Sequence, residues 1–133
     1  MDNYRLGEGN LVSSGEPTFN PDDQFFLIAN GAISKGTFIQ LEGSADGEVE
    51  TAADNAAAPI GIAFSDYADN ERVTADTRAY ASVTAVGAVT RGAKLGVAAG
   101  GLVKTYASGA SVGTALNTAA DTEEVRFVVN IQV

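Results

Sequence analysis

Short apolar stretches, separated by turns rich in Gly, Asn and Asp, follow one another along the chain from Gln24 onward. The first covers residues 25–29 and runs straight into Asn30-Gly31, a pair typical of hairpin turns. Similar stretches recur at intervals of about 8–12 residues, which indicates an all-β fold. They cover residues 37–41, 48–51, 60–64, 72–75, 78–89, 94–97, 102–106, 112–116 and 125–133. Residues 52–58 are rich in Ala and predict one helical turn that ends at Pro59.

The same order of sequence blocks occurs twice, which indicates an internal duplication. Residues 33–36 resemble 89–92 at an offset of 56, and residues 47–51 resemble 101–105 at an offset of 54. Two further blocks, 60–63 with 112–115 and 68–73 with 120–125, share an offset of 52. The copies span about residues 28–75 and 84–133, and neither is long enough to bury a sheet face alone. We therefore expect residues 24–133 to form a single β domain, a small barrel or sandwich built from the two copies.

Glycines and carboxylates in the repeated turns form the first set of candidate residues. Turns of this kind use Gly for close or left-handed backbone and Asp for hydrogen bonds to backbone N–H groups, so a structural role is favoured. Clustered carboxylates could instead bind Ca²⁺ weakly or act as an acid–base pair. The repeated positions are Gly36, Gly61, Asp69, Glu71, Gly92, Gly113, Asp121 and Glu123.

Residues 1–23 differ from the rest of the chain and predict an extended N-terminal arm. Pro17 and the Asn20-Pro21 pair mark turns, and the apolar residues show neither helical nor strand periodicity. A frayed terminus is the simple alternative. Isolated large apolar residues favour an arm that orders against a neighbour. The candidate anchors are Tyr4, Leu6, Leu11, Val12 and Phe19.

The composition excludes several kinds of chemistry. The chain has 8 basic and 17 acidic residues, a formal charge of −9, and neither Cys nor His. Disulfides, thiol nucleophiles and His-based catalysis are thus impossible. Scattered basic residues argue against a nucleic-acid partner. The chain has no apolar run of about 18 residues, so we expect no membrane span. We also expect no signal peptide, hence synthesis and retention in the cytoplasm of the producing cell. The acidic excess with few Lys residues suits a halophilic source.

One catalytic motif occurs by spacing alone. Residues 109–113 read Gly-Ala-Ser-Val-Gly, which matches the Gly-x-Ser-x-Gly nucleophile pattern. That motif needs a strand–turn–helix context and a His base, and Ser111 aligns with Pro59 in the other copy. We expect no enzyme, no cofactor and no metal site.

Several segments together resemble the capsid cement, or head decoration, proteins of tailed viruses. They are residues 59–63, 71–75, 87–92, 100–103 and 112–116, and the resemblance covers about residues 30–133. It implies a small β-barrel-like domain that assembles as a homotrimer on the outer surface of an icosahedral capsid and stabilises it. It also implies the major capsid protein as partner, an N-terminal arm lying along that protein, and no catalytic site. The acidic composition would suit a virus of halophilic archaea.

Two other functions stay open. A β module of a viral fibre, tail or surface adhesin could recognise glycans through Tyr67, Tyr80 and Tyr106. An enzyme that uses only carboxylates would depend on residues such as Asp69 and Glu71.

Overall fold

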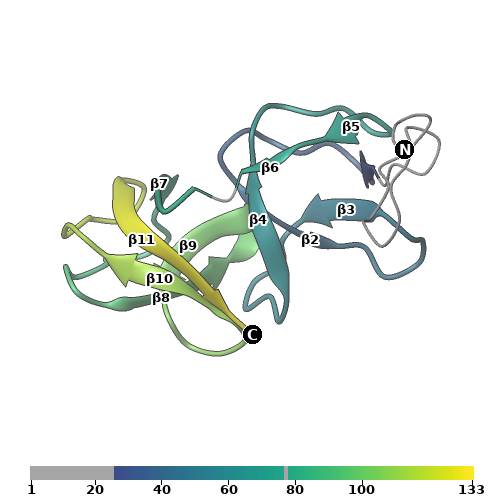
Figure 1. Cartoon of the computed structure of the whole chain (residues 1–133). Coiled ribbons are helices and arrows are strands. Elements are labelled where there is room, and N and C mark those ends of the chain that lie inside the picture. Colours follow the sequence, from purple (N-terminus) through teal and green to yellow (C-terminus); the bar gives the residue numbers. More distant parts are fainter. Residues whose placement is uncertain (1–25, 77) are drawn as a thin grey trace, which may run out of the picture.

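The computed structural model describes residues 26–76 and 78–133, which form an almost entirely β-stranded structure (Figure 1). The strands of the first half are β1 (Leu27–Ala29), β2 (Phe38–Leu41), β3 (Glu48–Thr51), β4 (Pro59–Ala63), β5 (Arg72–Val73) and β6 (Ala75–Asp76). Those of the second half are β7 (Tyr80–Thr84), β8 (Lys94–Ala98), β9 (Leu102–Thr105), β10 (Ser111–Ala115) and β11 (Glu124–Gln132). A short 3-10 turn, η2 (Ala99–Gly101), precedes β9.

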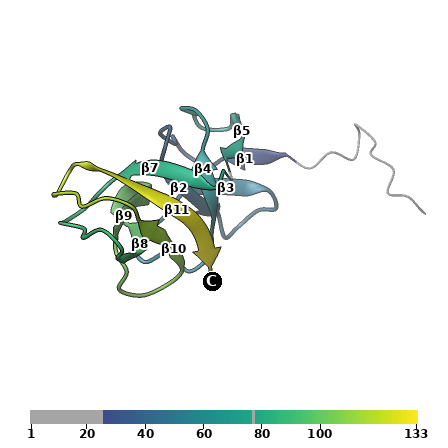
Figure 2. The same cartoon turned by 60° about the vertical axis from the view of Figure 1, so that its left-hand side comes forward.

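Each half of the chain builds one sheet, and the two sheets pack together. The first has the order β5-β1-β3-β2-β4-β6 and lies on the right in Figure 1, while the second has the order β7-β11-β10-β8-β9 and lies on the left. The longest strand, β11, bends across the front of the second sheet in Figure 2 and pairs with both β7 and β10. The predicted all-β fold is confirmed as a sandwich, and the described residues form no closed barrel.

The two halves share one architecture, as the sequence blocks predicted. In both, the second and fourth strands pair with a register shift at one position, between Ile39 and Gln40 in the first half and between Ser111 and Gly113 in the second. The turn before the second strand is closed in both by an antiparallel bridge, Ile33 with Tyr67 and Val89 with Ala119. Repeated sequence therefore corresponds to repeated structure.

Six buried positions recur in both halves and form the inner core of each sheet. They are Ala29, Ile33, Ile39, Val49, Ala63 and Val73 in the first half, and Ala85, Val89, Leu95, Val103, Ala115 and Val125 in the second. The second set belongs to a larger cluster, which also includes Phe38 and Ile62 of the first half. That cluster is where the two halves meet.

Two expectations from the sequence need correction. Residues 52–58 form a turn without helix, because Asn55 adopts a left-handed φ of 56° and its N–H donates to the carbonyl of Val97, 2.9 Å away. The stretch 78–89 is also interrupted. Its strand ends at Thr84, and Gly87, with a φ of 77°, begins a turn that hydrogen-bonds to Asp121.

The proposed arm lies outside the described residues. Its candidate anchors Tyr4, Leu6, Leu11, Val12 and Phe19 all fall in residues 1–25.

Candidate interaction surface

The repeated carboxylates hold backbone turns at equivalent places in the two halves. The Asp69 Oδ1 accepts a hydrogen bond from the N–H of Gly31 at 2.8 Å, and the Asp121 Oδ1 accepts one from Gly87 at 2.7 Å. Glu71 and Glu123 each accept the N–H of the residue three positions earlier, at 2.7 and 2.9 Å. These side chains therefore fix the turns that connect the strands.

The repeated glycines also occupy equivalent positions. Gly36 and Gly92 have φ angles of 80° and 87°, in the left-handed region that Gly adopts at no steric cost. Gly61 and Gly113 share a φ of 159° beside the register shift. A Cβ at Gly113 would lie 2.0 Å from the carbonyl oxygen of Val128, so only Gly lets β10 and β11 approach this closely.

The serine of the Gly-x-Ser-x-Gly pattern lies inside a sheet. Ser111 begins β10, is 7% exposed and pairs with Gly96 and Gln132. The nucleophile pattern needs an exposed serine on a strand-to-helix turn, a context that this strand does not provide. Within the described residues no group of three or more Asp and Glu side chains could hold a metal ion. The described residues also include no helix long and apolar enough to cross a membrane.

The halves meet in a joint between a side face of the first sheet and one end of the second. Phe38 is fully buried, and its ring centroid lies 6.1 Å from that of Phe127. Gly101 packs against the backbone of Phe38 so closely that a Cβ there would lie 2.6 Å from the Phe38 carbonyl oxygen. A hydrogen bond of 2.9 Å from the N–H of Ala110 to the carbonyl of Ala56 also crosses the joint. It is therefore both apolar and specifically hydrogen-bonded.

Equivalent rows of residues cross the outer faces of the two sheets but have opposite exposure. Residues directly opposite each other on paired strands lie on the same face. In the first half the row is Asp76, Ile62, Phe38 and Ala52; in the second it is Val128, Thr114, Lys94 and Tyr106. Ile62, Phe38 and Ala52 are 8%, 0% and 1% exposed because the joint covers them. Val128, Thr114 and Lys94 are exposed.

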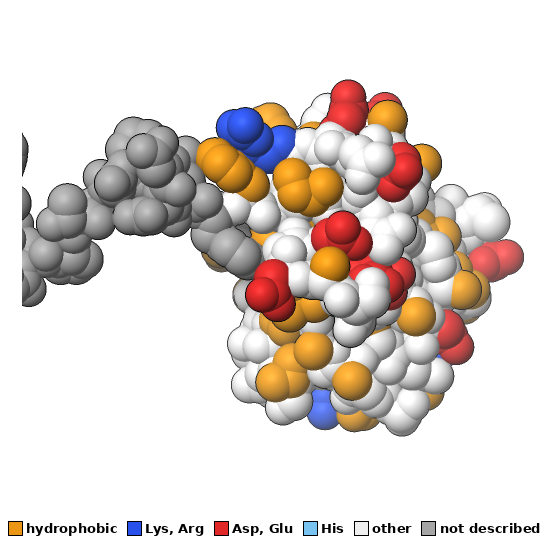
Figure 3. All heavy atoms as spheres, turned by 90° about the vertical axis from the view of Figure 1, so that its right-hand side faces the viewer, with side chains coloured by type: hydrophobic (Ala, Val, Ile, Leu, Met, Phe, Trp, Pro, Cys, Tyr) orange, Lys and Arg blue, Asp and Glu red, His pale blue; other side chains and the backbone are white. Residues whose placement is uncertain are grey.

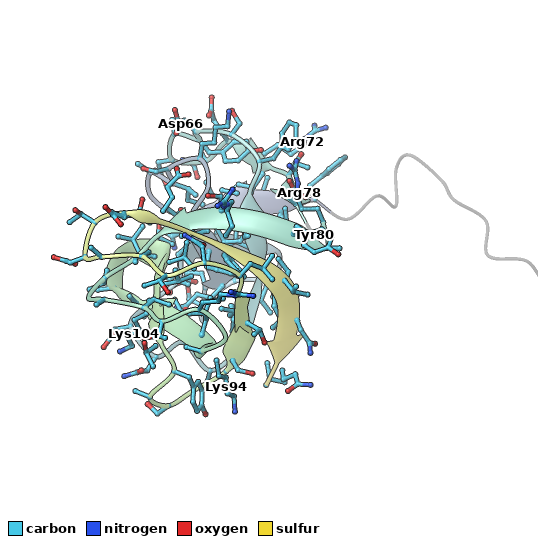
Figure 4. All side chains as sticks on the ribbon, turned by 90° about the vertical axis from the view of Figure 1, so that its left-hand side faces the viewer. Asp66, Arg72, Arg78, Tyr80, Lys94 and Lys104 are labelled. Carbon is cyan, nitrogen blue, oxygen red and sulfur yellow. The ribbon has the colours of Figure 1, made fainter. Side chains whose placement is uncertain are left out.

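We call the second row, with Tyr80 beside it, the open face. Tyr80 pairs with Val128 across β7 and β11 and is 64% exposed. The Lys94 Nζ lies 4.2 Å from the centre of the Tyr106 ring, a cation–π contact. Figure 4 looks onto the second half, with Lys94 at its lower side and Tyr80 at its right. The open face thus combines two aromatic rings, an aliphatic side chain and a positive charge.

The first half has an exposed counterpart to the end that the second half uses in the joint. Val97 and Val112 are fully buried, but their repeat equivalents are Leu41, 55% exposed, and the half-buried Ile60. A shallow hollow of about 440 Å³ lies here, lined by residues 41–47. We call Leu41, Ile60 and residues 42–47 the open end.

Acidic groups dominate the loop of the open end. Hydrogen bonds from the side chain and the backbone N–H of Ser44 lower the pKa of Glu42 below its ordinary value, so Glu42 is charged at neutral pH. Asp46 is exposed nearby, and Glu48 begins the next strand. The loop therefore presents negative charge beside exposed Leu41.

The net charge differs sharply between the halves. Residues 26–76 contain two basic and nine acidic residues, a net charge of −7. Residues 78–133 contain five basic and three acidic residues, a net charge of +2. Figure 3 shows the first half, with several groups of acidic side chains and few basic ones. The overall charge of −9 hides this polarity.

A second hollow, of about 480 Å³, lies between the halves. Its lining includes Lys35, Phe64 and Arg78, and Arg78 pairs with Asp76 at 2.6 Å. Phe64 is 56% exposed, like its repeat equivalent Leu116 at 47%.

The three tyrosines considered for glycan binding have different surroundings. The Tyr67 hydroxyl accepts the N–H of Thr74 at 3.0 Å, and the Tyr106 hydroxyl donates to the carbonyl of Gly109 at 3.0 Å. Of the three, Tyr80 alone is largely exposed. Two of the rings are therefore tied to their own turns.

Of the open face, the sequence pattern pointed to Tyr80 and Tyr106 alone, and did not join them to Lys94, Thr114 and Val128. Each of its members lies in a predicted strand or at a strand end, where a pattern of alternating residues marks only the two sides. A comparison of the copies would have found it, since Phe38 aligns with Lys94 and Ile62 with Thr114. Loss of apolar character at equivalent positions is the signal.

Comparison with known proteins gives a likeness in fold. Neither protein-family profiles nor curated protein sequences match the chain. Among solved structures, the chain is similar to the N base of the head fiber protein gp8.5 of bacteriophage phi29. The TM-score is 0.66 at 20% sequence identity, over 80% of this chain and 92% of that chain. At this identity the likeness shows a shared fold.

Proposed function

We propose that this chain is a structural protein of a virus particle, a decoration or cement protein on the outer surface of an icosahedral head. The observation that carries the proposal is the fold, shared over most of both chains with the base of a phage head fiber. The segments that resemble head decoration proteins point to the same class. In this proposal the chain is not an enzyme, binds no cofactor and works through surface contacts alone.

The proposed partners are the major capsid protein and further copies of this chain, assembled as a homotrimer. The arm, residues 1–23, would lie along the capsid protein. Three arms on one assembly multiply weak contacts through their high effective concentration. A protein that binds the assembled shell, and not its separated subunits, stabilises the shell by mass action. Nucleic acid and membrane have no part in this mechanism.

A salt-adapted source fits the same proposal. The first half, at −7, would present a highly hydrated acidic surface to the solvent. We propose that the source is a halophilic virus, whose protein is made in the host cytoplasm and then joins the virion.

The decisive experiment uses shells from which this protein has been removed. Purified full-length protein should bind them at a fixed ratio to the capsid subunits and raise the temperature at which they break. A variant without residues 1–23 should bind more weakly, while its circular dichroism spectrum stays that of a folded β protein. Absence of stoichiometric binding, with no rise in the disruption temperature, would refute the proposal. Equal affinity without residues 1–23 would remove the role of the arm.

Glycan recognition by a fibre, tail or adhesin module is the alternative that the exposed Tyr80 supports. A flat exposed ring is a suitable platform for a sugar face. A glycan array with the full-length protein and the Tyr80→Ala variant separates the two functions. Tyr80-dependent binding to a defined glycan, without any binding to shells, would favour the alternative.

A further inference from the structure

The open face of the second half is equivalent to a face that the first half buries within the same chain. We infer that the open face binds the open end of a second copy, so that copies of this chain join head to tail. This inference rests on the self-association in the proposed function and does not depend on binding to a capsid.

The internal joint provides the template for this contact. There, the outer row of one sheet, with Phe38 and Ile62, is covered by the end of the other half, where Val97 and Val112 lie buried. The N–H of Asn55 donates to the carbonyl of Val97 across the same joint. One repeat unit therefore already uses its end to cover the side of another.

Both components of that joint occur a second time without being covered by the other half. The outer row of the second half is exposed at Val128, Thr114 and Lys94. The end of the first half is exposed at Leu41, the equivalent of Val97. Because the halves share the order of four neighbouring strands and the register of the row that crosses them, a second copy can place its open end on the open face in the way that the internal joint is built. The open face of one copy and the open end of a second copy are thus each suited to cover the other.

Charge favours this pairing. The open end belongs to the half with net charge −7, and its loop carries Glu42 and Asp46 beside Leu41. The open face belongs to the half with net charge +2 and presents Lys94, with Arg126 exposed on the same face of β11. Opposite charges at the two surfaces attract, while contact between two open ends brings carboxylates together. A head-to-tail arrangement is therefore preferred over an end-to-end one.

The chemistry of the open face suits a contact between proteins. Tyr80 and Val128 provide apolar area, and Lys94 and Thr114 provide polar groups that water can solvate before binding. Interfaces between proteins that also exist free in solution combine aromatic anchors with a polar rim in this way. The internal joint instead uses Phe38 and Ile62, which are both buried in the folded chain.

A head-to-tail contact has a symmetry consequence. Each copy uses two different surfaces, so copies close into a ring or continue as a filament. A trimer ring would satisfy all open faces and open ends at once. This property gives the inference a test that a dimer joined through two identical surfaces cannot imitate.

The test uses two full-length variants, each of which blocks one surface. Thr114→Arg places a large charged side chain in the middle of the open face, and Leu41→Arg does the same at the open end. Both residues are exposed, so neither change disturbs the core. Ala32→Arg, in an exposed turn of the first half, is the matched control. The mass of each protein in solution is measured by sedimentation velocity, with circular dichroism to verify folding.

The wild type and Ala32→Arg should form the same closed oligomer, whereas each blocked variant should be a folded monomer. An equimolar mixture of the two blocked variants should form a heterodimer and nothing larger. Only one intact face and one intact end meet in that mixture, and the other pair sets Arg against Arg.

Each contrary result has a defined meaning. A monomeric wild type, or blocked variants that assemble as the wild type does, would overturn the inference. Two monomeric variants whose mixture stays monomeric would also overturn it, because the two surfaces then bind something other than each other. An oligomer lost on removal of residues 1–25, but kept in both blocked variants, would assign self-association to that segment. If the oligomer behaves as inferred but never binds stripped shells, only the capsid part of the proposed function fails.

Discussion

The two halves of this chain share the order of four neighbouring strands, β3-β2-β4-β6 and β9-β8-β10-β11, and the same six inner core positions, yet they differ on their outer faces. At one equivalent position the first half has Phe38, fully buried, and the second has Lys94, exposed. At the next equivalent position the first half has Ile62, which is buried, and the second half has Thr114, which is exposed. The inner core must be kept in both copies because each sheet depends on it. The outer row is free to change, and it became a joint in one copy and an open surface in the other.

The largest expected difference in the free energy of unfolding is between alanine variants at Phe38 and at Lys94. Phe38→Ala should lower the free energy of unfolding by about 3–5 kcal/mol, because it removes a buried aromatic ring and leaves a cavity in the joint. Lys94→Ala, at the equivalent exposed position, should change it by less than about 0.5 kcal/mol. Urea unfolding followed by circular dichroism measures both. Equal losses in the two variants would contradict the different roles of the two rows.

A second comparison concerns two glycines with the same backbone conformation. Gly109 and Gly100 have φ angles of 78° and 77°, but a Cβ at Gly109 would lie 2.2 Å from the carbonyl oxygen of Asn55, while one at Gly100 meets nothing within 4 Å. Gly100→Ala should cost about 1–2 kcal/mol for the left-handed conformation alone. Gly109→Ala should cost about 1–3 kcal/mol more, because it forces the halves apart.

Thermal unfolding of the two glycine variants at matched concentration gives the difference directly. An equal decrease in melting temperature would show that the joint tolerates an extra methyl group. It would then be looser than the contact between Gly109 and Asn55 indicates.

The smallest effect tests what the halves have in common. Asp69→Ala and Asp121→Ala each remove one hydrogen bond to a turn N–H, and each should cost about 1 kcal/mol. Because the two turns belong to different halves, the double variant should lose the sum of the single losses, to within about 0.5 kcal/mol. Chemical unfolding of the three proteins is the measurement. A loss in one half alone would mean that the repeated turns are not equivalent in stability.

Local features of the fold were predictable from the sequence. The spacing of apolar stretches predicted the strands, and the repeated Ala-Asp-x-Glu segments predicted turns that Asp69 and Asp121 do hold. The resemblance of residues 60–63 to 112–115 predicted two strands that occupy equivalent positions in their sheets. In each case the cause lies within a few residues along the chain.

Features that depend on contacts between the halves were not predictable in this way. The Ala-rich residues 52–58 have helical propensity, but hydrogen bonds from Asn55 to Val97 and from Ala110 to Ala56 favour a turn. Alternation places Phe38 on one side of its strand without revealing that the second half covers that side. Whether an outward residue is covered is decided by tertiary packing, which a single pattern does not encode.

The uneven distribution of charge also affects how the molecule moves before any contact forms. With −7 on one half and +2 on the other, the described part of the chain has a large electric dipole along the line that joins its halves. In the field of a charged neighbour such a dipole turns the molecule during diffusion, so more encounters begin in the right orientation. Salt weakens this steering once the separation exceeds the Debye length, about 8 Å at physiological ionic strength. Assembly of this protein should therefore slow with rising salt, through its association rate more than through its dissociation rate.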